Sequence, residues 1–169
     1  MSFSSAVRIF GVLLVAAAQG GCFKPLLAGA EGSRLDDELS AIKIEPIPDR
    51  MGHYLANELT FAFSGSGLSG APKYRLQVNL NQKVQTPVID TVSGRASAAS
   101  FMVDAEYRLM PVSSNNTITS GVAFTLIGYD RTSQRYSNMR AGRDAEVKAA
   151  RALAEQIRLK LISDISSSR

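Results

Sequence analysis

The chain has 169 residues, with 19 Lys+Arg against 15 Asp+Glu, one cysteine and one histidine. This length suits one domain of ordinary size with its own hydrophobic core, and the single cysteine excludes an internal disulfide. A Cys/His zinc site is also excluded, because the chain has one cysteine and one histidine. The sequence has no cluster of Lys and Arg interleaved with aromatic residues, so nothing in it favours nucleic-acid binding.

The first 21 residues have the composition of a bacterial signal sequence. Arg8 is followed by the apolar run Ile9–Ala18, which is too short for a membrane span of about 20 residues. Small residues then precede Cys22, and this pattern resembles a lipobox, the recognition site of bacterial lipoprotein processing. Gln19 departs from it, because an aliphatic residue is usual there.

We therefore expect residues 1–21 to be removed and Cys22 to become the acylated N-terminus, which would tether the protein to a membrane without spanning it. The alternative is an ordinary signal peptide cut near Ala18, which would leave Cys22 as a free thiol. An unpaired cysteine is unusual in an exported protein, and lipidation accounts for it.

Residues 22–40 are predicted to form the lipidated N-terminus and a flexible spacer, because the segment from Lys24 mixes Pro, Gly, Ala and Ser with few large apolar residues. A single domain is expected over residues 41–165. It begins with a strand over Ala41–Ile47, where apolar and polar residues alternate until Pro46 and Pro48 end the strand.

A helix is predicted over Arg50–Ser64, with Asp49 in a position to cap it. Apolar residues recur there at steps of four and would form one buried stripe: Met51, Leu55, Leu59 and Phe63.

Three strands should follow, over Tyr74–Ile89, Ala98–Leu109 and Ile118–Tyr129. In the second of these strands the apolar set is Phe101, Val103, Ala105, Tyr107 and Leu109, and in the third it is Val122, Phe124 and Leu126. Alternation of this kind predicts an antiparallel meander with one face in water.

The last predicted helix has the clearest apolar stripe: Ala150, Leu153, Ile157, Leu161 and Ile165. Asp144 and Glu146 should lie in its first turn, and residues 166–169 should fray. The predicted fold is therefore α+β, with the order β-α-β-β-β-α. Two helices are expected to cover one face of a four-stranded, mainly antiparallel sheet.

The chain offers few groups for catalysis. His53 is the only imidazole and lies near the start of the first predicted helix, where a surface role is favoured over that of a general base. We expect no enzyme activity, no catalytic residue, no metal and no cofactor.

The chain resembles the lipopolysaccharide-assembly lipoprotein LptE family, of the alphaproteobacterial type, over nearly its whole mature length. The resemblance depends on the order of short motifs, which are Gly21–Leu26, Ile44–Gly52, the Tyr-x-Leu-x-Val strand at Tyr74–Val78, Asp144-Ala145, and Leu153–Ile157.

The resemblance implies a plug inside the lumen of a large outer-membrane β-barrel, an LptD-like partner that the lipoprotein helps to assemble. The pair would insert lipopolysaccharide into the outer leaflet. Phe23, after the lipidated cysteine, would permit transfer to the outer membrane, with the protein on its periplasmic side. By family position, lipopolysaccharide would bind Arg95, Arg140 and Arg143, since arginine suits bidentate contact with phosphate.

Two other functions are compatible with a lipid-anchored domain. The first is an auxiliary outer-membrane lipoprotein of an ATP-driven lipid transport system. The second is a pilotin-like chaperone for a secretin, which would require a hydrophobic groove that the sequence does not locate. Each of the three arginines could also be an ordinary solvated surface residue.

Overall fold

The computed structural model describes residues 30–64, 71–89 and 96–167. The chain divides into two compact units, residues 1–33 and 34–169, and the second holds the whole sheet. The elements in chain order are α2 (Ala30–Ser40), β1 (Ile42–Ile44), α3 (Asp49–Ser64), β2 (Tyr74–Ile89), β3 (Ala96–Pro111), β4 (Thr119–Asp130) and α4 (Arg135–Ser167). From β1 onward, the predicted α+β order β-α-β-β-β-α is confirmed.

The four strands form one sheet in the order β1-β2-β3-β4. The short β1 runs parallel to β2, while β2, β3 and β4 are antiparallel neighbours, so that Leu76 pairs with Leu109 and Ala105 with Ala123. The register between β2 and β3 shifts between Gln85 and Val88. Pro87 lies within that interval and has no N–H to give to the ladder, which accounts for the irregularity.

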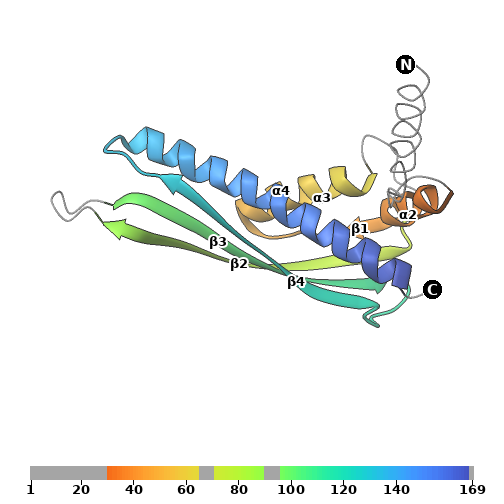
Figure 1. Ribbon diagram of the computed structural model, residues 1–169. Coiled ribbons are helices and arrows are strands. Elements are labelled where there is room, and N and C mark those ends of the chain that lie inside the picture. The colour runs from red at the N-terminus through yellow and green to blue at the C-terminus, as the bar shows by residue number, and fades with distance from the viewer. Residues whose placement is uncertain (1–29, 65–70, 90–95, 168–169) are drawn as a thin grey trace, which may run out of the picture. The chain divides into compact units, whose positions relative to one another are not determined.

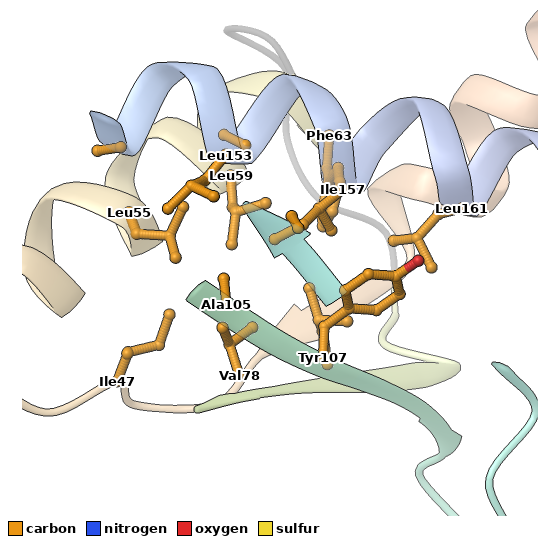
Figure 2. Close-up of a cluster of buried hydrophobic side chains, with 14 of the residues drawn as sticks. Ile47, Leu55, Leu59, Phe63, Val78, Ala105, Tyr107, Leu153, Ile157 and Leu161 are labelled. Carbon is orange, nitrogen blue, oxygen red and sulfur yellow. The ribbon is translucent and has the colours of Figure 1, made fainter. Parts of the chain in front are cut away.

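Both α3 and α4 pack on the same face of the sheet (Figure 1). The predicted stripe of α3 is buried at every position, with Leu55 and Leu59 at 0% exposure. The predicted stripe of α4 is also buried, except that Ile165 is only partly covered. Figure 2 shows these leucine side chains gathered above Val78 of β2 and Ala105 and Tyr107 of β3. A bidentate ion pair between Arg50 and Glu146, with N–O distances of 2.8 and 2.6 Å, joins the two helices at the surface.

The spacer prediction was wrong for residues 30–40, which form the helix α2. Leu35 and Leu39 are one helical turn apart, and both are buried in the core at 6% and 1% exposure. Two apolar residues make too short a stripe to stand out in a segment otherwise rich in small and polar residues. The folded part therefore begins before Ala41.

The predicted start of α4 was also wrong, because the helix begins at Arg135 rather than near Asp144. The Asn138 side chain holds this earlier start, since its Oδ1 accepts from the Thr132 N–H at 2.8 Å and its Nδ2 donates to the Thr132 carbonyl at 2.8 Å. The Thr132 hydroxyl also accepts from the Gln134 N–H at 3.2 Å. The other end continues to Ser167, so residues 166 and 167 are helical and not frayed.

The apolar set of β4 faces away from the helices. Val122, Phe124 and Leu126 are 50%, 48% and 51% exposed, whereas Ala123 is fully buried and Thr125 is 8% exposed. The alternation predicted a strand correctly but placed its two faces the wrong way round. The register explains this, because Ala123 pairs with Ala105 and Thr125 with Val103, both on the face that α4 covers.

Tyr107 gives the fold a measurable dependence on alkaline pH. Its side chain is 2% exposed, and burial, with a smaller effect of the Asp164 carboxylate, raises the pKa of its hydroxyl above the ordinary value of 10.0. The unfolded chain therefore releases this proton at lower pH than the folded chain does. The stabilisation from the buried neutral hydroxyl is complete below the pKa that Tyr107 has in the unfolded chain. It is lost as the pH rises through the higher pKa of the folded protein.

We expect the free energy of unfolding of the wild type to fall more steeply than that of Tyr107→Phe between about pH 9 and about pH 11. Denaturant titrations of both proteins across this range would measure the difference. The other four tyrosines are the same in both proteins, so curves that decline in parallel would show that Tyr107 does not contribute.

Candidate functional site

Of the four residues predicted to carry function, two are in the described part of the chain. Arg140 and Arg143 lie on consecutive turns of α4, within the helix rather than at its start, and both are exposed. Cys22 and Arg95 lie outside the described residues, so the structure does not test the lipidation site or the third arginine. Arg140 and Arg143 line one open depression of about 520 Å³, together with Ser137, Ala141, Asp144 and Val147.

Two further arginines that the sequence analysis did not select belong to the same stretch. Arg131 precedes α4 and Arg135 is its first residue, and both are exposed. Positive charge at the N-terminus of a helix is opposed by the helix dipole. Within the described residues, no acidic side chain forms an ion pair with any of the four arginines, and the nearby Asp144 pairs with Lys148 at 2.6 Å instead. We call this cluster, Arg131, Arg135, Arg140 and Arg143, the arginine segment.

Apolar side chains accompany the arginine segment. Tyr136 is 69% exposed and Met139 is 50% exposed. Exposed guanidinium groups can form bidentate hydrogen bonds with phosphate oxygens, and adjacent apolar side chains can contact hydrocarbon. The chemistry of this surface therefore suits an amphiphile with an anionic head group.

The second candidate surface is the face of the sheet opposite α3 and α4, which no element in the described residues covers (Figure 1). Its composition changes from polar on β2 to apolar on β4. On the β4 side, Val122, Phe124 and Leu126 form a continuous row, and Met102 of β3 pairs with Leu126. Contiguous exposed apolar residues of this kind are typical of a surface that contacts a partner. We call Val122, Phe124 and Leu126 the apolar row.

The outer edge of β4 is partly closed by side chains of α4. The Gln156 amide accepts from the Phe124 N–H at 3.3 Å and donates to the Phe124 carbonyl at 3.0 Å, and Lys160 donates to the Val122 carbonyl. These contacts could not be found in the sequence, because they depend on how α4 crosses the sheet.

The only imidazole lies on the surface of α3. His53 is exposed, and its Nε2 lies 3.3 Å from Nδ2 of Asn57, one helical turn later. Among the described residues there is no group of three or more His, Cys, Asp or Glu side chains that could hold a metal ion. None of the helices formed by these residues has the length and apolar character needed to cross a membrane.

The fold is similar to those of solved lipoprotein structures. No family model matches the chain, and no curated protein matches it. The chain is similar to the solved structure of a protein of Caulobacter crescentus described as a lipoprotein. The two match with a TM-score of 0.63 and 21% sequence identity, over 78% of this chain and 95% of that one. A minor lipoprotein of Acinetobacter baumannii gives a TM-score of 0.56 and 15% identity, covering 73% and 92%. At these identities the likeness shows a shared fold.

Proposed function

We propose that this protein is a lipid-anchored subunit of the outer membrane, on its periplasmic side, that plugs and helps to assemble a β-barrel translocon. In this role it takes part in inserting lipopolysaccharide into the outer leaflet. The observation that carries the proposal is the arginine segment, in which one exposed arginine precedes α4 and three lie in the N-terminal part of that helix, with no ion-pair partner among the described residues. Such charges suit the phosphates of lipopolysaccharide, and the resemblance to the LptE family implies that Arg140 and Arg143 contact the lipid.

The fold supports the membrane part of the proposal. The solved structures from Caulobacter crescentus and Acinetobacter baumannii are both described as lipoproteins, and each is matched over more than 90% of its length. The leader and Cys22 have the pattern of a lipoprotein precursor. A chain attached through three acyl groups would stay at the membrane surface while its folded part meets a partner.

The uncovered face of the sheet supports the partner part of the proposal. A barrel lumen is polar, and a plug within it needs a largely polar exterior. The exposed face of β2 carries polar side chains that include Asn79, Asn81 and Lys83, while the apolar row on β4 supplies a more hydrophobic contact. We infer a docking subunit with no catalytic role.

Charge reversal of the arginines tests the lipid site. The variant Arg95→Glu, Arg140→Glu, Arg143→Glu should still assemble with the barrel but bind lipopolysaccharide about tenfold more weakly at low salt, since each exposed charge contact contributes about 0.2–1 kcal/mol. Binding of purified protein to immobilised lipopolysaccharide, measured across a salt series, gives this number. The difference should shrink as salt is added.

The matched control reverses three exposed basic residues away from the arginine segment, as Lys43→Glu, Lys73→Glu, Arg151→Glu. Both variants change the net charge equally, so equal loss of binding would mean that overall charge, and not this site, attracts the lipid. Copurification of the tagged wild type tests the partner. A large outer-membrane barrel supports the plug, whereas inner-membrane transporter components alone would favour the auxiliary transport lipoprotein.

A further inference from the structure

Side chains from one row of α4 bond to β4 in a regular sequence, and two of them reach backbone groups of its outer edge. The Thr119 hydroxyl donates to Asp164 Oδ2 at 2.6 Å, Lys160 donates to the Val122 carbonyl, and Gln156 makes both of its bonds to Phe124. Successive members of the row are four residues apart on α4, and their partners on β4 are two or three residues apart. Unpaired backbone groups at a sheet edge are a template for another strand. At Phe124, the Gln156 amide occupies the place that such a strand would take.

The next member of this row is Ala152, which has no polar group. Outward-facing backbone groups alternate along a strand. Because the N–H and C=O of Phe124 face outward to Gln156, those of Leu126 and Gly128 face the same way. Ala152 cannot reach them with a hydrogen bond, and Lys148, a further turn away, pairs with Asp144. Within the described residues, no side chain bonds to the outer edge of Leu126 or Gly128.

The uncovered face beside this uncapped edge is open. Gly128 lies on that face with Phe124 and Leu126, and a Cβ built on it would meet no atom within 4 Å. Phe124 and Leu126 are about half exposed on the uncovered face beside it, so an added strand would find open backbone groups together with apolar side chains.

We propose that the β4 edge over Leu126–Asp130 binds an extended segment of the barrel partner by backbone pairing, as an added strand of this sheet. The segment would carry apolar side chains toward Phe124 and Leu126 and small or polar side chains toward Ala152. The identity of the partner rests on the proposed function. The mode of binding rests on Ala152, which leaves the outer backbone groups of Leu126 and Gly128 without a bond from α4.

A second copy of this chain fits the edge less well. Antiparallel pairing about Gly128 would join only the five residues Leu126–Asp130 of each copy, because Gln156 and Lys160 already occupy the rest of the edge. A stable interface normally buries roughly 1,600 Å², far more than so short a ribbon provides. A larger partner that also covers the sheet face can supply the remaining area.

We call Asp164, Lys160 and Gln156 of α4 the capping row. The variant Ala152→Gln should close the edge by extending this row by one more side chain. Glutamine is a good helix former, so α4 should remain folded. Loss of two backbone hydrogen bonds corresponds to about tenfold or more in the dissociation constant for the barrel. The matched control is Leu159→Gln, which adds the same side chain to α4 at a half-exposed position outside the capping row. This control should bind the barrel like the wild type.

Hydrogen exchange of the wild type measures the same contact without a substitution. In the complex with the barrel, the amides of Leu126 and Gly128 should exchange at least about tenfold more slowly than in the free protein. Unchanged exchange at both amides, or a folded Ala152→Gln variant that binds the barrel as the wild type does, would overturn the pairing and leave the proposed function intact. Failure of the wild type to bind any barrel would remove the proposed function and the named partner together. A dimer of the isolated protein that Ala152→Gln dissociates would assign the edge to a second copy instead.

Discussion

The substitution Leu153→Ala should lower the free energy of unfolding by about 2–5 kcal/mol, a large part of the total stability of a domain of this size. Leu153 lies in the middle of α4, is fully buried, and belongs to the same cluster as Leu55 and Leu59 of α3. Figure 2 shows its side chain directed toward these leucines. Truncation to alanine would leave a cavity between α3, α4 and the sheet, because these packed elements can move only partly to fill it.

Denaturant unfolding followed by far-ultraviolet circular dichroism would measure this loss. The control is Leu159→Ala on the same helix, where the side chain is 50% exposed and the expected change is within about 0.5 kcal/mol. If the two variants unfold at the same denaturant concentration as the wild type, α4 is not packed on the sheet as described.

The two covering helices could be predicted because their apolar residues recur with the helical period over several turns. Met51, Leu55, Leu59 and Phe63 lie in one row, and all four are buried. The length of α4 could not be predicted from this pattern, because its first two turns extend beyond the core and have no apolar stripe. The signal present there was local, in the Thr132 and Asn138 side chains that hold the helix start.

The faces of β4 could not be predicted by choosing the larger apolar set. Ala123 and Thr125 lie on the side of β4 that α4 covers, and they pair with Ala105 and Val103 of β3. Small side chains at these positions allow the helix to lie close to the sheet, and the large residues Phe124 and Leu126 are left on the other face. Alternation specifies that two faces differ, but the packing of another element decides which one is buried.

Only part of the arginine segment could be selected from the sequence, for the same kind of reason. Arg140 and Arg143 were selected by resemblance and lie together on an exposed stretch, while Arg131 and Arg135 join them only because α4 starts earlier than predicted. The capping of β4 by Gln156 and Lys160 links residues more than 30 positions apart in the sequence. Nothing in the local sequence distinguishes Gln156 from any other partly exposed polar residue of a helix.

Gly52→Ala should destabilise the protein by about 2–3 kcal/mol, although alanine is the better helix former by about 1 kcal/mol. A Cβ at Gly52 would lie 2.6 Å from the Ile47 carbonyl oxygen and 2.8 Å from both its carbonyl carbon and its Cγ2. Two of these atoms belong to the backbone that leads from β1 into α3, so no side-chain rotation can relieve the contact. Either α3 must shift away from Ile47, or that segment must move and disturb the burial of Ile47 and Met51.

Gly142→Ala is the matched control, because Gly142 is also inside a helix but its Cβ would meet only the Tyr129 hydroxyl, at 3.9 Å. Without a clash, the propensity gain should remain, and this variant should be more stable than the wild type by about 0.5–1 kcal/mol. Thermal and denaturant unfolding of the two variants should therefore shift in opposite directions. A stabilised Gly52→Ala variant would mean that the approach of α3 to Ile47 is looser than the structure shows, and that helix propensity alone governs both sites.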